Sequence, residues 1–369
     1  CTSKWYDNHS LVQYNYLYCS SRSLSSLSIR HRVPMTSLPI NQLLLRNPEI
    51  INDQLLTVNP PLDQGLFQLV KPHNCQIINF DARIHQACEK QSLRSEFGLP
   101  TQHEFASALL YWPKSKAFGH SLLRWLASQI KQPTTVYLLA ANDAGGKSLN
   151  NAVKDFGEEV IKLDVARKCS LWSFKLTPID DFSWEKELST FSYDNLDGDA
   201  LEFSTYPGVF NTGKLDVGTK LLLDNISLNK RGRVLDLACG SGIIGITCKL
   251  RQPELYVEMV DIDGMALTSA EFNTKKFGLD CPVFVSDGLS NTKKFNTIIC
   301  NPPFHQGKET DYNFAQQLIR TAKQHLLPRG EVWIVANRQL AYEQWAEKSC
   351  HSVESVVQGN GFKVLRLKY

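Results

Sequence analysis

The chain has 369 residues, of which 43% are hydrophobic and 21% charged, and its formal net charge is +3. This length and composition are typical of a globular protein with two domains, each large enough to bury a core of its own. The slight basic excess is compatible with an RNA partner but excludes a strongly basic nucleic-acid-binding tail. No apolar run approaches the roughly 20 residues that cross a bilayer, so we expect no membrane segment.

The first 34 residues differ from the rest of the chain. They are rich in Ser, Tyr and Arg, show no helical or strand period, and begin with Cys1, whereas the first methionine is Met35. No continuous apolar core follows their basic residues, so they do not resemble a signal peptide. We expect this segment to be disordered or to lie upstream of the true start.

Short apolar strands alternate with helical patterns in both halves of the chain. In the first half they are expected at residues 55–58, 76–80, 108–111 and 135–139. In the second half they are expected at residues 234–237, 256–260, 283–285, 297–300 and 331–335. This alternation predicts parallel βαβ units and therefore an α/β fold with a doubly wound sheet in each half.

The two halves follow the same order. Matching positions differ by 178 (Leu43 to Leu221), 180 (Asp81 to Asp261) and 196 (Val136 to Val332). A shared order and nearly constant offset indicate a duplication. The polar, acidic stretch 183–199 is the expected boundary. We therefore expect two tandem Rossmann-like domains, at residues 35–190 and 195–369.

The halves differ at the turn after their first strand. In the first half this turn holds Gly65 beside Pro60 and Pro61, whose rings and missing amides suit a nucleotide poorly. In the second half the turn runs through Ala238-Cys239-Gly240-Ser241-Gly242 to Gly245. Glycines let a backbone turn tightly and approach a ligand, and the following helix start offers free amides. The second half is therefore the expected cofactor domain, and the first a degenerate copy.

Three carboxylates refine the nature of that cofactor. Asp261 ends the next expected strand, where it can accept hydrogen bonds from ribose hydroxyls. Asp236, before the glycines, would attract a positively charged ligand end such as the methionine ammonium of S-adenosylmethionine, and would repel a pyrophosphate. Asp287 ends a third strand, where it can contact an adenine amino group or remain a solvated turn residue. S-adenosylmethionine is the cofactor that these positions favour.

The most specific feature is Asn301-Pro302-Pro303-Phe304, directly after an expected strand. The side-chain oxygen of Asn301 and the carbonyl of Pro302 can each accept an N–H from an exocyclic amino group, which aims the nitrogen lone pair at a methyl donor. Phe304 offers a flat face for an unstacked base. The sequence therefore predicts an amino-group methyltransferase acting on a planar nitrogen.

With these residues in place, the chain resembles the ribosomal RNA small subunit methyltransferase C family over residues 35–369. The points of resemblance are residues 111–114, 166–169, 208–210, 215–218, 234–236 with the glycine turn, and 301–305 with Gly307. The resemblance implies a degenerate methyltransferase domain followed by an active one. It also implies methylation of guanine N2 at position 1207 of 16S rRNA, with the 30S subunit as partner and S-adenosylmethionine as cofactor.

Alternatives stay open at this point. The same site suits an enzyme that methylates adenine N6 or a protein glutamine amide. The glycine turn with Asp261 also occurs in nicotinamide-dependent oxidoreductases, although Asp236 and the Asn301 turn argue against that class. A catalytically inactive RNA-binding scaffold is a further interpretation, more suited to the first half.

The cysteines and the basic residues allow further predictions about metal binding and RNA contacts. The ten cysteines form no C-x-x-C pair, so we expect reduced thiols in a cytoplasmic protein and no metal site. We also expect a monomer. Phe210 and residues 215–218 are expected to line the cofactor or base pocket or to pack at a strand edge. Candidate phosphate contacts are Lys275, Lys276, Lys293, Lys294, Arg338, Lys363 and Arg366.

Overall fold

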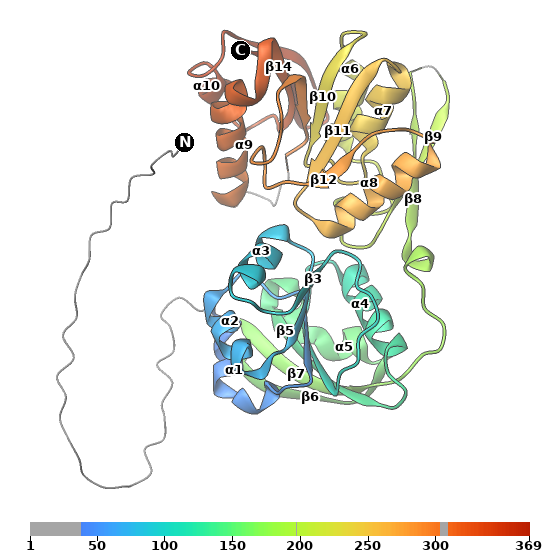
Figure 1. Ribbon diagram of the computed structural model, residues 1–369, viewed down its shortest axis with the longest axis vertical. Helices are drawn as coiled ribbons and strands as arrows, with labels where there is room; N and C mark the ends of the chain where they lie inside the picture. The colour runs from blue at the N-terminus through green and yellow to red at the C-terminus, as the bar shows by residue number, and fades with distance from the viewer. Residues whose placement is uncertain (1–37, 197, 303–308) are drawn as a thin grey trace, which may run out of the picture. The chain divides into compact units, whose positions relative to one another are not determined.

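The computed structural model describes residues 38–196, 198–302 and 309–369, with the backbone alone at 309–312. The chain divides into two units, and the second of them, residues 34–369, contains every described residue. The described residues form two seven-stranded sheets and a two-stranded hairpin (Figure 1). Pro303 and Phe304 of the expected catalytic turn, together with the segment 1–34, lie outside the described part of the chain.

The first sheet has the strand order β3-β2-β1-β4-β5-β7-β6. Its first five strands in that order are parallel, whereas β7 and β6 are antiparallel to their neighbours. The strands are β1 (Leu55–Val58), β2 (Gln76–Asn79), β3 (Ser95–Phe97), β4 (Ser107–Tyr111), β5 (Thr134–Ala141), β6 (Gly157–Ala166) and β7 (Cys169–Leu176). The helices of this half are α1 (Gln42–Arg46), α2 (Gln64–Val70), α3 (Ala82–Lys90), α4 (Lys116–Ser128) and α5 (Leu149–Val153).

The second sheet repeats this order as β12-β11-β10-β13-β14-β16-β15, with β16 and β15 antiparallel. Its strands are β10 (Gly232–Leu237), β11 (Leu255–Asp261), β12 (Val283–Val285), β13 (Phe295–Cys300), β14 (Leu326–Asn337), β15 (Ser352–Gly359) and β16 (Phe362–Lys368). The helices are α6 (Val217–Asn225), α7 (Ile243–Arg251), α8 (Gly264–Lys276), α9 (Glu309–Thr321) and α10 (Tyr342–Ala346). The identical strand order confirms the tandem Rossmann-like fold.

Two features differ from the sequence expectation. Each sheet ends in an antiparallel pair, which alternation of strands and helices alone does not predict. In addition, the polar stretch between the halves contains half of a hairpin, β8 (Ser189–Asp194) with β9 (Ala200–Thr205). Phe191 and Phe203 stack across it with ring centroids 5.8 Å apart. Aromatic cross-strand pairs of this kind stabilise a hairpin in a stretch whose other side chains are mostly polar.

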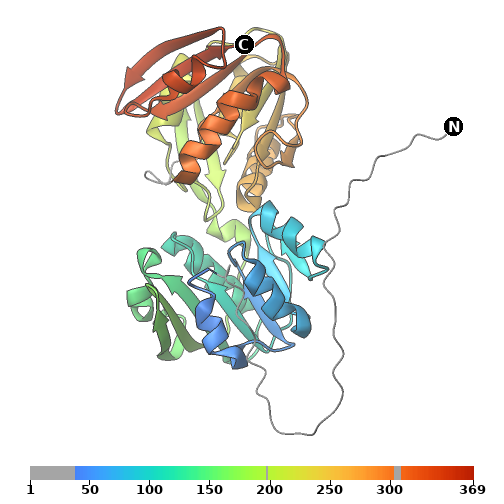
Figure 2. The same cartoon turned by 90° about the vertical axis from the view of Figure 1, so that its left-hand side faces the viewer.

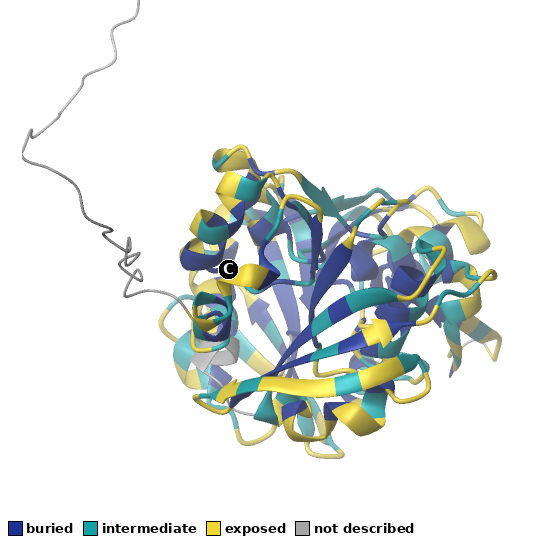
Figure 3. Cartoon of the chain, turned by 90° about the horizontal axis from the view of Figure 1, so that it is seen from below, coloured by how far each residue is buried: buried dark blue, intermediate teal, exposed yellow. Residues whose placement is uncertain are grey.

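Helices cover both faces of the second sheet. Val234 faces α6, α7 and α8, and the next residue, Leu235, faces α9 and α10, because successive side chains of a strand point to opposite faces. Figure 2 shows α9 lying across its face of the sheet. Buried residues are concentrated in the central strands, and exposed ones on outer helix faces, on loops and on the edge strand β6 (Figure 3). The sheet is therefore a rigid support for the loops at its ends.

Candidate active site

Four loops begin together at the carboxyl edge of the second sheet. Leu237, the last residue of β10, pairs with Val260 of β11 and with Cys300 of β13. Asp261, which ends β11, pairs with Val285, which ends β12. Loops at this edge of an open α/β sheet are where ligands bind. The expected cofactor turn and the expected catalytic turn are therefore neighbours in space.

The turn after β10 has an unusual backbone. Ala238, Gly240 and Gly242 all have positive φ angles, of 58°, 56° and 78°. A Cβ added at Gly240 would have Val209 Cγ1 as its nearest described neighbour, 4.0 Å away, so this glycine faces open space. The turn therefore leaves room for a ligand directly before α7, whose first amides lack helical partners.

Gly245 serves packing rather than ligand approach. A Cβ at this position would lie 2.8 Å from the Cγ and the Sδ of Met259 on β11. The absence of a side chain lets α7 lie close to the sheet, which is the role of the third glycine in such turns. The three glycines thus divide between binding and packing.

Asp236 lies behind the turn. Its side chain is fully buried, and Oδ2 accepts a 2.8 Å hydrogen bond from the Gly245 amide. Its Oδ1 has no partner among the described residues. The pKa of Asp236 is raised to about 7, chiefly by burial and also by the nearby charge of Asp261, against the lowering effect of the Gly245 bond. Any attraction for a ligand cation therefore acts across the turn backbone, and that role stays a prediction.

Asp261 holds the cofactor turn in place. Its Oδ2 accepts from the Gly240 amide at 2.9 Å, and its Oδ1 accepts from the amides of Ile262 and Asp263 at 2.7 and 3.0 Å. Burial raises the pKa of Asp261, opposed by these backbone bonds. Oδ1 already accepts two hydrogen bonds, whereas Oδ2 accepts one and keeps a lone pair that could accept from a ribose hydroxyl; that contact stays a prediction.

The remaining predicted cofactor residues contribute less directly. Cys239 is buried, and its amide donates to the carbonyl of Val260 at 3.0 Å, so it offers backbone rather than side-chain contacts. Asp287 is exposed after β12 at the same edge, where its contact with an adenine stays a prediction. Phe210, expected near the pocket, is 50% exposed and follows Val209, which lies beside Gly240.

Asn301 is the best-defined element of the catalytic turn. Its Nδ2 donates to Thr219 Oγ1 at 2.7 Å and to Asp216 Oδ2 at 3.0 Å. Its Oδ1 is buried and has no partner in the described part of the chain. Pro302 is buried beside it. A buried acceptor without a partner costs about 1–3 kcal/mol, so Oδ1 is available to a donor on water or on a ligand.

Two residues of this site were not predicted from the sequence. Thr219 contacts Asn301, and its signal was the Asp216-x-x-Thr219 pattern that starts α6, where Asp216 accepts from the Thr219 amide at 2.8 Å. Asn273 on α8 donates to the Ser241 carbonyl at 2.9 Å and so supports the glycine turn. No local sequence pattern distinguishes Asn273 from a surface asparagine.

The candidate phosphate contacts are not equally available. Lys363 is buried and pairs with Glu343 at 2.6 Å, so its expected contact with a phosphate is wrong. Arg366 pairs with Glu331 at 2.7 Å, and Lys276 pairs with Glu202 at 2.6 Å. The acidic partners lie on α10 for Lys363, on the neighbouring strand β14 for Arg366 and on β9 for Lys276.

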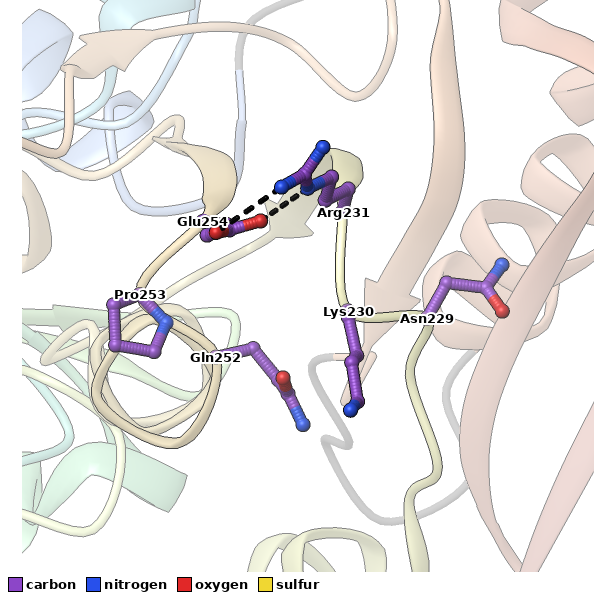
Figure 4. Close-up of a pocket in the computed structure, with 6 residues that line it drawn as sticks. All are labelled: Asn229, Lys230, Arg231, Gln252, Pro253 and Glu254. Atoms are coloured by element: carbon purple, nitrogen blue, oxygen red, sulfur yellow. Dashed lines mark hydrogen bonds and ion pairs between the residues drawn. The ribbon is translucent and has the colours of Figure 1, made fainter.

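A separate cavity of about 640 Å³ lies at the opposite edge of the second sheet (Figure 4). Its lining comes from the segments before β10 and before β11, where Arg231 and Glu254 form an ion pair. The amino ends of these strands face away from the glycine turn. This cavity is therefore distinct from the candidate active site.

The acidic, histidine and cysteine side chains of the described residues are dispersed. Within residues 38–196, 198–302 and 309–369, no three His, Cys, Asp or Glu side chains are grouped to hold a metal ion. The eight cysteines described there are free thiols, and seven of them are buried. Over the same ranges, none of the helices combines the length and apolarity needed to span a bilayer.

Comparison with known proteins agrees with this geometry. The family described as Methyltransferase small domain matches residues 200–366, and its N-terminal counterpart matches residues 41–190. A ribosomal RNA small subunit methyltransferase C from Acinetobacter baylyi is 32% identical over 336 residues, covering 89% of this chain and 99% of that protein. The one from Vibrio parahaemolyticus is 37% identical, covering 76% and 81%.

A solved structure shares the whole architecture. It is the T. thermophilus 16S rRNA N2 G1207 methyltransferase in complex with AdoMet and guanosine, with a TM-score of 0.77. Sequence identity is 21%, and the match covers 89% of this chain and 91% of that one. At this identity the likeness shows the fold, whereas the curated relatives show the family. The chain therefore belongs to the ribosomal RNA small subunit methyltransferase C family.

Proposed function

We propose that this chain transfers a methyl group from S-adenosylmethionine to the exocyclic N2 of a guanine in 16S rRNA, at the position equivalent to 1207. The observation that carries the proposal is the buried Oδ1 of Asn301, which lies beside the glycine turn and has no partner among the described residues. An amino group can donate to such an oxygen, whereas a keto oxygen cannot. The family relatives, named for small-subunit rRNA methylation, support the same reaction.

The residues present fit the cofactor. Gly240 faces open space, the amides at the start of α7 are free of helical partners, and Oδ2 of Asp261 retains a lone pair for a hydroxyl group. When bound there, S-adenosylmethionine supplies an electrophilic methyl group on its sulfonium. Gly240, Gly242 and Asp261 would hold it, and Asp236 and Asp287 are the further candidates at its charged and adenine ends.

The chain's own contribution to the chemistry is orientation of the substrate nitrogen. Asn301 Oδ1 accepts one N–H of the guanine amino group, and the Pro302 carbonyl is positioned by sequence to accept the other. Held in this way, the nitrogen presents its lone pair in a fixed direction, and catalysis arises from positioning and preorganised dipoles. The proton that leaves the nitrogen after transfer can pass to water, so no side-chain base is required.

The partner and setting follow from the same proposal. We propose that the chain acts as a monomer in the cytoplasm on 16S rRNA of the 30S subunit. Naked 16S RNA and assembled 30S subunits, both lacking the modification, should be compared as substrates with labelled S-adenosylmethionine. Incorporation into either one supports the reaction, and their relative rates identify the form that is recognised.

A matched pair of variants tests the site. Asn301→Ala should lower the single-turnover rate by a factor of about 100 or more while cofactor affinity changes only a few fold, because the lost acceptor acts on the substrate nitrogen. Asn59→Ala is the control, since Asn59 occupies an Asn-Pro-Pro turn after β1 and donates to the Tyr111 carbonyl at 3.0 Å. Equal losses in both variants, or equal losses of rate and cofactor affinity in Asn301→Ala, would overturn the assignment.

A further inference from the structure

We propose that Asp216 and Thr219 are positioning residues that fix the carboxamide of Asn301 with its oxygen toward the substrate amino group. The inference rests on the proposed function and deepens it. Both partners bind the same atom, since Asn301 Nδ2 lies 3.0 Å from Asp216 Oδ2 and 2.7 Å from Thr219 Oγ1. The opposite atom, Oδ1, is the buried acceptor without a partner in the described residues.

The chemistry of the partners allows one orientation of the amide. An ionised carboxylate only accepts hydrogen bonds, so Asp216 must face the NH₂ group of Asn301. The Thr219 hydroxyl donates its proton to Asp216 Oδ2 at 3.2 Å, which leaves its oxygen to accept from Asn301. Both Nδ2 hydrogens are thereby used. A flipped amide would place Oδ1 against the Asp216 carboxylate, which has no proton to donate, and would lose the bond to that charged group.

The arrangement is anchored to a helix start rather than to the loop that carries Asn301. Asp216 is the N-cap of α6 and accepts from the Thr219 amide at 2.8 Å. Thr219 is 6% exposed, and Leu222 and Leu223 of the same helix are fully buried. A capped, buried helix turn is a rigid support, which is what a catalytic acceptor needs if it is to stay within about 0.5 Å of its working position.

A functional consequence follows for substrate choice. An acceptor that cannot flip favours a nucleobase that offers N–H at this point and rejects one that offers a lone pair. If Asn301 were free to flip, its NH₂ could instead bind a keto oxygen. The two partners therefore fix the amide so that it presents only its oxygen, which selects a substrate amino group. Their loss should lower the rate of methyl transfer more than the affinity for the cofactor.

Two pairs of variants separate positioning from folding. Thr219→Val removes the hydroxyl at nearly constant volume, and Thr219→Ser retains it. Asp216→Ser keeps an N-cap but is too short to reach Asn301, whereas Asp216→Asn keeps both the cap and an acceptor oxygen. We expect a rate loss of about 10- to 100-fold in Thr219→Val and Asp216→Ser, as when an outer partner of a functional group is removed. Cofactor affinity should stay within about twofold, and the conservative variants should restore most of the rate.

A second readout does not depend on activity. The Asn301 side-chain amide can be observed by NMR in protein labelled with ¹⁵N-asparagine and assigned by its loss in Asn301→Ala. Its protons should exchange slowly with solvent in wild type and Thr219→Ser, and faster in Thr219→Val and Asp216→Ser. Equal exchange in wild type and Thr219→Val would overturn the positioning role. If exchange behaves as expected but wild type does not methylate guanine N2, the positioning role stands and the proposed function fails.

Discussion

Replacement of Asp236 by Asn should make the free energy of unfolding less sensitive to a rise in pH from about 4 to about 7. The Asp236 carboxyl is fully buried, with a pKa raised to about 7 chiefly by burial, while an aspartate in the unfolded chain ionises near 3.9. Below about pH 4 both states are protonated. Between pH 4 and 7 the folded state keeps a proton that the unfolded state has lost, so stability falls as the pH rises.

The size of the effect follows from the pKa. A rise from 3.8 to about 7 corresponds to about 4 kcal/mol, of which about 3 kcal/mol is lost between pH 5 and pH 8. Asparagine does not ionise, and its side-chain oxygen can still accept from the Gly245 amide, as Asp236 does at 2.8 Å. Asp236→Asn should therefore avoid this loss. Asp263, whose pKa is also raised to about 7, leaves a residual pH slope in both proteins.

The assay is urea unfolding followed by tryptophan fluorescence at pH 5, 6, 7 and 8. The difference in unfolding free energy between Asp236→Asn and wild type should shift in favour of the variant by about 3 kcal/mol from pH 5 to pH 8. Asp180→Asn, at an exposed position, is the control and should follow wild type. Parallel pH curves for wild type and Asp236→Asn would refute the reasoning.

Three further predictions concern other residues of the second half of the chain. Asp261→Ala should weaken S-adenosylmethionine binding by about tenfold or more, because the Gly240 amide and the ribose lose their acceptor; unchanged affinity in calorimetry would contradict this. Gly240→Ala should reduce cofactor affinity but cost only about 1–2 kcal/mol of stability, since its φ of 56° is strained for alanine while the space around it is open; retained affinity would show that no ligand approaches there. Lys363→Ala should lower the melting temperature but leave the salt dependence of RNA binding unchanged, because Lys363 is buried against Glu343. A reduced salt slope would restore it as a phosphate contact.

Much of the fold followed from local patterns. Apolar runs such as 234–237 and 297–300 became β10 and β13, since a short apolar run between turn signals has few other stable environments in an α/β protein. The antiparallel strand pairs at the sheet ends were not predicted. Their residues alternate only weakly, as in β15, where the pairing with β16 is set by tertiary contacts rather than by local sequence.

The location of the candidate site could be predicted from the sequence, whereas most of its side-chain contacts could not. The roles of the glycine turn and of Asn301 could be predicted because they depend on residue type and local spacing. The register of β10 and β13 brings both turns to the carboxyl edge of the sheet. The partners of Asn301, Thr219 and Asp216, lie at the start of α6, 82 and 85 residues earlier. The Asp216-x-x-Thr219 pattern marks a helix start, but it does not show that this start contacts Asn301. The burial of Lys363 could not be predicted from the sequence either, because a single lysine in an apolar strand usually lies at the surface.

The most direct test of the central claim is the identity of the modified nucleoside. The protein should be incubated with labelled S-adenosylmethionine and 30S subunits lacking the modification, after which the 16S RNA is digested and its nucleosides separated. The proposal predicts label in N2-methylguanosine from the fragment that contains position 1207. Label in N6-methyladenosine or in protein glutamine would contradict the guanine assignment while preserving the amino-group chemistry, and transfer to none of these acceptors would contradict the proposed function itself.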